Sequence, residues 1–127
     1  MGYYFSKTLK IPFEEAVERT IAALKQHEFG VLTRIDVKNT LKERIGAEFR
    51  PYVILGACNP RMAHQALQAE DKIGTMLPCN VIIQEIDGNS EVAAVDPVAS
   101  MQAIHNEALA RVATMVREDL KAAVQSL

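Results

Sequence analysis

The chain has 127 residues and a mass of 14.0 kDa, the size of one domain, and its 49% hydrophobic content is enough for a single core. Fourteen Lys and Arg residues against sixteen Asp and Glu residues give a formal charge of -2 without a basic cluster, which argues against a nucleic-acid partner. Since the apolar runs are far shorter than the roughly 20 residues of a membrane span and the start lacks a secretory signal, we expect a cytoplasmic protein with no membrane partner.

The N-terminal part of the chain predicts a strand followed by a helix. Residues 3–9 are short and rich in aromatic side chains, as in a first strand. Pro12 stands where a helix can begin without losing a hydrogen bond, and apolar residues then recur at steps of three and four up to Leu24. Gly30 is the expected end of this most regular helix.

The next segment predicts two more strands with a short helix between them. Residues 31–37 alternate as a strand does. Asn39 is expected to cap a short helix that ends near Ile45. The third strand is expected over residues 49–57, and Pro51 places its start at an edge or before pairing begins, because proline has no N–H to donate.

A well-marked helix start and a hairpin follow. Asn59 is a suitable N-cap, and Pro60 takes the first helical position. Residues 80–86 and 91–95 are two strands around the loop Asp87-Gly88-Asn89-Ser90, whose residues tolerate a positive φ.

The last segment predicts a long helix. Asp96-Pro97 ends the preceding strand, and Asp96 is expected to cap the helix, which runs either in one piece or after a short first turn over 97–101. An apolar stripe runs along it through Ile104, Ala108, Val112, Met115, Val116, Leu120 and Val124. Because this stripe is long for one small sheet, its surplus apolar area indicates a homodimer contact.

Several motifs agree in order and spacing with a known family. From "IPFEEAVERTIAALKQHEFGVLTRIDV" through "YVILGACNPRMAHQALQAEDKIGTMLPCNVIIQE" to Asp96-Pro97, the sequence resembles domain of unknown function 302. The resemblance implies a single α+β domain over residues 1–127. In it, a mostly antiparallel sheet of about five strands carries helices on one face. It also implies a small bacterial or archaeal protein that pairs as a homodimer. It implies no activity, because a fold by itself does not define a function.

The two cysteines are the most distinctive candidate site. Cys58 directly precedes the N-cap Asn59, so its sulfur is expected near the positive end of a helix, which can lower a thiol pKa. If the strands before and after the intervening helix are antiparallel, the strand after Cys79 begins at the same end of the sheet at which the strand before Cys58 finishes. A parallel crossover would instead put them at opposite ends of the sheet.

Three interpretations of the cysteines stay open. They are small buried residues under a strand–helix corner, a thiol-redox pair, or ligands of a metal or haem. A spacing of 21 positions matches no CxxC pair, and a zinc site would need further ligands. Asn59 and Asn80 either orient a small ligand or serve as a cap and a turn residue.

These observations lead to three functional hypotheses. The first is a small-ligand-binding module that takes an apolar ligand where Cys58, Asn59, Cys79 and Asn80 meet the long helix. The second is a thiol-redox or metal- or haem-handling protein that uses Cys58 and Cys79. The third is a homo-oligomeric interaction module without a ligand. The sequence shows no catalytic triad and no phosphate-binding loop, so it assigns no reaction and no particular cofactor.

Overall fold

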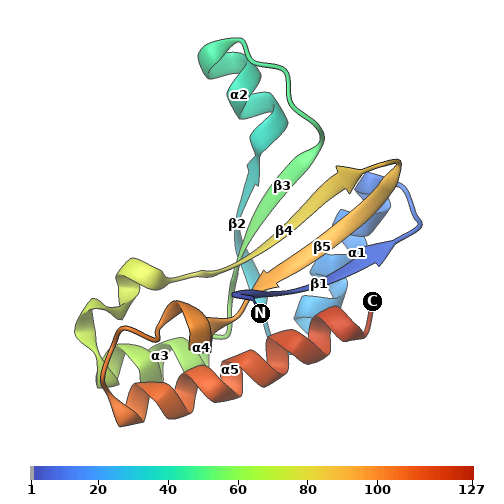
Figure 1. Ribbon diagram of the computed structural model, residues 1–127. Coiled ribbons are helices and arrows are strands. Elements are labelled where there is room, and N and C mark those ends of the chain that lie inside the picture. The colour runs from blue at the N-terminus through green and yellow to red at the C-terminus, as the bar shows by residue number, and fades with distance from the viewer. Residues whose placement is uncertain (1) are drawn as a thin grey trace.

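One antiparallel sheet and a layer of helices make up the computed structural model, which describes residues 2–127 (Figure 1). The elements in chain order are β1 (Tyr4–Leu9), α1 (Phe13–Gln26), β2 (Gly30–Asp36), α2 (Val37–Ile45), β3 (Tyr52–Cys58), α3 (Pro60–Ala69), the 3₁₀ helix η1 (Asp71–Met76), β4 (Cys79–Ile86), β5 (Asn89–Val95), α4 (Pro97–Ser100) and α5 (Glu107–Gln125).

The strand order is β1-β5-β4-β3-β2, and every neighbouring pair is antiparallel. The predicted α+β class with a five-stranded antiparallel sheet is therefore confirmed. The predicted hairpin of β4 and β5 is present, and Asp87 and Gly88 in its turn have positive φ, as predicted for the loop. The turn is shorter than predicted, because Asn89 and Ser90 already pair with Ile86 and Glu85 as part of β5.

One face of the sheet forms the core with the helices. Alternate residues of the central strands point toward α1 and α5 and are at most 3% exposed; they are Val53, Leu55, Val81, Ile83, Val92 and Ala94. Burying each larger apolar side chain of this kind contributes about 1.5–3 kcal/mol. From the helix side, Val17 and Leu24 of α1 and Leu109 and Leu120 of α5 complete the core.

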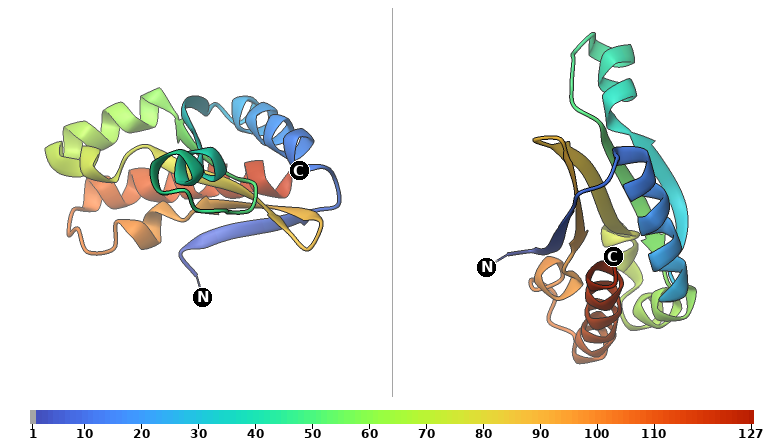
Figure 2. Two further views of the ribbon diagram at one scale, coloured as in Figure 1. Left: turned by 90° about the horizontal axis from the view of Figure 1, so that it is seen from above. Right: turned by 90° about the vertical axis from the view of Figure 1, so that its right-hand side faces the viewer.

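The other face of the sheet is covered by none of α1, α3 and α5 (Figure 2). Side chains of alternate positions point to this side because the side-chain period of a strand is two residues. We call it the helix-free face; its residues are Tyr4, Tyr52, Ile54, Asn80, Ile82, Gln84, Glu91 and Ala93.

The long C-terminal helix is divided in two. The predicted first turn is α4, and the chain then leaves the helical path before α5 begins at Glu107. Asn106 explains the new start, because its Oδ1 accepts the Leu109 N–H at 3.0 Å while its Nδ2 donates to the Ala69 carbonyl at 2.7 Å. In the predicted stripe, Ala108 and Met115 are exposed, whereas Val112, Val116, Leu120 and Val124 are buried.

The α2 segment departs from the expected layer. It stands at the end of an arm formed by β2 and β3, away from the other helices (Figure 1), and none of its residues is buried. Its N-cap is Asp36, whose Oδ1 accepts the Asn39 N–H at 3.0 Å. The prediction that Asn39 is the cap is therefore wrong. The strand after α2 begins to pair only at Tyr52, directly after Pro51.

Within residues 2–127, no helix has both the length and the apolar content needed to cross a membrane.

Candidate functional site

The two cysteines lie at the same end of the sheet. Ala57 of β3 pairs with Cys79 of β4 in antiparallel register, and Cys58 is the next residue along β3. The antiparallel alternative is thus the correct one. Both thiols are free; Cys79 is buried and Cys58 is half-buried.

Burial determines the protonation of both thiols. It raises the pKa of Cys58. Burial, together with the neighbouring Cys58, raises the pKa of Cys79 to about 11. Cys58 therefore does not have the lowered pKa that a position beside a helix N-terminus can produce, because burial disfavours its thiolate. Both sulfurs are thiols at neutral pH, whereas nucleophilic attack and metal binding require the thiolate.

A small apolar cavity does lie where the cysteine corners meet the helices. Its volume is about 30 Å³, and its walls include Phe29, Met62, Met101 and Val112 together with Cys58, Asn59 and Cys79. That volume is far below the roughly 300–1,000 Å³ of typical ligand pockets. Asn59 uses its side chain to cap α3, accepting the Met62 N–H at 3.3 Å, as predicted for an N-cap.

Asn80 does not line the small cavity with the other three candidate residues, although it borders an open hollow of about 350 Å³ together with Cys79. It is exposed on the helix-free face, whereas its neighbour Cys79 points toward the helices. Among residues 2–127, the Asn80 side-chain amide has no hydrogen-bond partner. The structure therefore gathers Cys58, Asn59 and Cys79 around the small cavity and leaves Asn80 on the opposite side of the sheet.

Asn80 borders a much larger hollow on the helix-free face. This hollow has a volume of about 410 Å³ and is lined by Tyr3, Tyr4, Tyr52, Asn80, Ile82, Gln84, Glu91, Ala93, Ala94 and Val95. The register explains its position: Ala93 faces Ile82 across β4 and β5, and larger side chains stand on the flanking strands. A short side chain at the centre of the sheet thus leaves room between tyrosines at either side.

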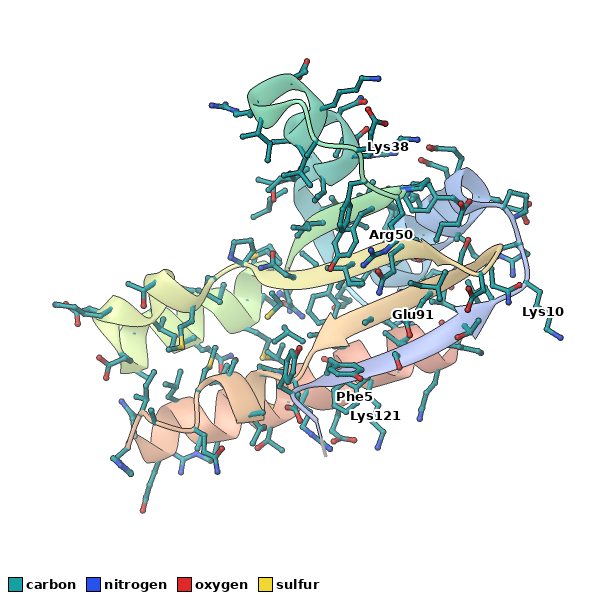
Figure 3. All side chains as sticks on the ribbon, turned by 45° about the horizontal axis from the view of Figure 1, so that its top comes forward. Phe5, Lys10, Lys38, Arg50, Glu91 and Lys121 are labelled. Carbon is teal, nitrogen blue, oxygen red and sulfur yellow. The ribbon has the colours of Figure 1, made fainter. Side chains whose placement is uncertain are left out.

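A chain of hydrogen bonds crosses one end of this hollow. Arg50 Nε donates to Gln84 Oε1 at 2.8 Å, and Gln84 Nε2 donates to Glu91 Oε1 at 2.8 Å. Figure 3 labels Arg50 and Glu91, which belong to the segment before β3 and to β5. The Arg50 guanidinium also lies over the rings of Phe49, at 4.4 Å, and Tyr52, at 5.7 Å. These contacts fix the orientation of the Gln84 amide and hold Arg50 in place.

Part of the hollow can be inferred from the sequence. The predicted hairpin loop sets a register in which Gln84 lies opposite Glu91, and the alternation of Asn80, Ile82 and Gln84 marks one face of β4. The contributions of Tyr4 and Tyr52 could not be inferred in this way, because they depend on which strands lie at either side of the hairpin.

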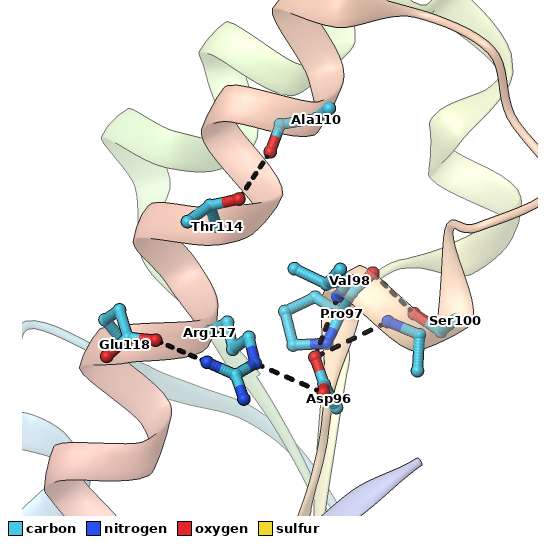
Figure 4. A network of polar contacts seen from close by, with 9 residues as sticks. Asp96, Pro97, Val98, Ser100, Ala110, Thr114, Arg117 and Glu118 are labelled. Carbon is cyan, nitrogen blue, oxygen red and sulfur yellow. Dashed lines mark hydrogen bonds and ion pairs between the residues drawn. The ribbon is translucent and has the colours of Figure 1, made fainter. Parts of the chain in front are cut away.

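A second polar cluster lies on the helix side and is structural (Figure 4). Asp96 Oδ1 accepts the Val98 N–H at 3.0 Å, which makes Asp96 the cap of α4, as predicted. Its Oδ2 accepts from Arg117 Nε at 3.3 Å, and this hydrogen bond raises the pKa of Arg117. Asp96 therefore connects the end of β5 and the start of α4 to α5.

Fold and site together define an α+β protein with a single antiparallel sheet, helices on one face and a tyrosine-lined hollow on the other. The family model described as "Domain of unknown function DUF302" matches residues 5–127, and the chain belongs to this family. It is similar to the crystal structure of an uncharacterized conserved protein DUF302 from Bacillus stearothermophilus. The TM-score is 0.92 and the identity is 26%, with 98% of each chain covered. A comparison with curated proteins gives no match.

Proposed function

We propose that this protein is a small-ligand-binding module whose ligand occupies the hollow on the helix-free face. The observation that carries the proposal is the combination of volume and lining. The hollow measures about 410 Å³, and aromatic and apolar side chains surround a small set of polar groups. Binding sites for small molecules typically have this size and this composition.

The polar groups of the hollow differ in what they can offer a ligand. The Gln84 amide is engaged at both ends, by Arg50 and by Glu91. The Asn80 amide, in contrast, has no side-chain partner within residues 2–127, so it is free to donate to a ligand and to accept from it. Of the four residues that the sequence suggested, Asn80 is therefore the one we place in the binding site.

The cysteine corner supports a binding site less well. Its cavity of about 30 Å³ has space for little more than a water molecule. The open hollow of about 350 Å³ that Cys79 also borders has no aromatic side chain in its lining. The raised pKa of both thiols argues against the thiol-redox and metal- or haem-handling alternatives. Two free cysteines are consistent with a reducing compartment, so a cytoplasmic location remains part of the proposal.

Fragment screening by NMR tests the location of the binding site. In ¹H–¹⁵N spectra of the labelled protein, ligands in the hollow should shift the amide signals of Asn80, Gln84 and Glu91. Ala93→Leu should abolish these shifts, because it places a branched side chain on the floor of the hollow. Ala122→Leu, on the exposed side of α5, is the matched control and should leave them unchanged.

A different set of shifts would contradict this location. Shifts confined to Met62, Met101 and Val112 would move the binding site to the cavity at the cysteine corner. If fragments bind as well to the Ala93→Leu protein as to the unmodified protein, the hollow is not the binding site.

A homodimer is a second candidate, favoured by exposed apolar side chains on the arm. Leu32 of β2 is 66% exposed and Ile45 of α2 is 72% exposed. A nine-residue helix without a buried residue gains little from packing in the isolated chain, whereas a symmetric contact would cover its apolar side. We therefore place the proposed dimer contact on β2 and α2, and not mainly on the last helix as the sequence had indicated.

Light scattering over a range of protein concentrations tests the dimer and its location. Ile45→Lys should shift the protein toward the monomer, because it places a charge within the proposed contact. Met115→Lys, on the exposed side of α5, should not change the mass. The opposite pattern would return the contact to the last helix, and a monomer at all concentrations would exclude the dimer.

A further inference from the structure

We propose that the ligand of the hollow is a small organic cation, an amine or amidinium carried on a flat apolar body, held by the Glu91 carboxylate and by the tyrosine rings. This inference rests on the proposed function, because it assigns a chemical class to the ligand of the same hollow. Three observations support it: the charge of the lining, the aromatic side chains, and the use that the protein already makes of this surface.

The charge of the lining comes from one residue. Glu91 is the only acidic residue among those that line the hollow, and no Lys, Arg or His lines it. Its Oε1 accepts a neutral amide hydrogen bond from Gln84, and within residues 2–127 no Lys, Arg or His forms an ion pair with it. The carboxylate is half-buried, so a cation beside it would be less screened than at an open surface.

Tyrosines line both sides of the hollow. Tyr3 and Tyr4 come from the β1 side and meet edge to face, with ring centroids 5.1 Å apart and planes at 76°. Tyr52 comes from the β3 side. The negative face of an aromatic ring attracts a cation, and several rings together with a carboxylate form the usual environment for a bound ammonium group.

The protein itself already holds one cation at the border of the hollow. The Arg50 guanidinium lies over Phe49 and Tyr52 and donates to Gln84. Arg50 is not among the residues that line the hollow. Arg50 competes with Glu91 for this assignment, since an anionic ligand would be drawn to the exposed Arg50 and not to Glu91.

A set of three probes with the same ring and different charge decides between these two residues. Benzylamine is a cation at pH 7, benzyl alcohol is neutral and benzoate is an anion. We expect benzylamine to bind about five- to tenfold more tightly than benzyl alcohol, with benzoate the weakest, as measured by NMR titration of the Asn80 and Glu91 amides at low salt. Tighter binding of benzoate would overturn the proposal.

Two matched variants connect the preference to Glu91. Glu91→Gln keeps the size of the side chain and an acceptor for Gln84, so it should remove most of the preference for benzylamine over benzyl alcohol. Glu85→Gln makes the same charge change on the same hairpin, but Glu85 pairs with the buried Ser90 and so faces the other side of the sheet. The Glu85→Gln protein should therefore keep its preference for benzylamine over benzyl alcohol. An equal loss in both variants would show a general charge effect and overturn the assignment.

The outcomes separate this inference from the proposed function. If all three probes bind with equal affinity and shift the amide signals of the hollow, the ligand class is wrong while the hollow remains the binding site. If none of the probes shifts the hollow but fragments of another chemistry do, the same conclusion follows. If neither the probes nor the screened fragments shift the amide signals of the hollow, both proposals are wrong.

Discussion

Gly56 lies in β3 at a point where two side chains approach the backbone closely. A Cβ atom at this position would overlap Thr33 Oγ1 and would lie 2.7 Å from Cγ of Pro78. Thr33 belongs to the neighbouring strand and Pro78 to the connection that leads into β4, so the absent side chain lets three segments meet.

Gly56→Ala should therefore lower the free energy of unfolding by about 1–3 kcal/mol, since overpacking forces the neighbours to move. Urea denaturation measures this loss. Gly30→Ala is the matched control, because its nearest contact would be the Cys58 carbonyl at 4.0 Å. An equal loss in both variants would mean that the close approach at Gly56 is unimportant.

The raised pKa of Cys79 predicts a loss of stability at alkaline pH. The folded pKa of about 11 lies above the reference value of 9.0, so the folded state disfavours the thiolate. The contribution of the protonated Cys79 to the free energy of unfolding is fully present below pH 9 and is lost as the pH rises through 11. The difference corresponds to a loss of about 2–3 kcal/mol.

Thermal unfolding from pH 8 to pH 11 measures this effect. Cys79→Ala should flatten the pH dependence, whereas Cys58→Ala, at a more exposed sulfur, should keep most of it. A thiol reagent at pH 8 should likewise modify Cys79 only slowly in the folded protein. Rapid modification would contradict the burial of this sulfur.

At the scale of elements, α2 depends on its cap to an unusual degree. None of its residues is buried, so the hydrogen bond from the Asn39 N–H to Asp36 is one of few interactions that hold its first turn. Asp36→Ala should reduce the local stability of α2 by about 1 kcal/mol.

Hydrogen exchange of the α2 amides measures this effect directly. Protection in α2 should fall several-fold in Asp36→Ala, whereas β4 and β5 should keep their protection. Asn39→Ala tests the cap that the sequence had suggested and should have little effect on protection. The reverse result would make Asn39 the cap after all.

Elements whose sequence signals lie within a few neighbouring residues could be predicted best. Asn59 with Pro60, Asp96 with Pro97 and the Asp87-Gly88 turn are signals within a few residues, and the structure confirms all of them. Asp36 was missed because it was assigned to the strand, although a strand end and a helix cap can be the same residue.

The remaining errors concern contacts between distant segments. The break before α5 depends on the hydrogen bond from Asn106 to the distant Ala69 carbonyl. The hollow depends on Tyr4, Gln84 and Tyr52 coming together from three strands, which only the strand order can show. The choice among the three interpretations of Cys58 stayed open because its burial cannot be inferred from sequence spacing.

At the scale of the whole molecule, Asp96 joins the sheet to both C-terminal helices. Its backbone N–H donates to the Tyr3 carbonyl at 2.7 Å, and its side chain caps α4 and binds Arg117. Asp96→Ala should lower the global stability by about 1–2 kcal/mol through the lost cap alone. Arg117→Ala leaves that cap in place and should have a smaller effect, which parallel thermal unfolding of both variants would show.

The strand order also has a consequence for synthesis on the ribosome. Tyr4 of β1 pairs with Val95 of β5, so the first strand to be made has its partner among the last. Until β5 has left the exit tunnel, β1 is an unpaired strand that carries the exposed Tyr4, and α5 cannot yet cover the core. The sheet can therefore close only after β5 has been made, and a chain that is released before that point exposes an unpaired strand to other chains.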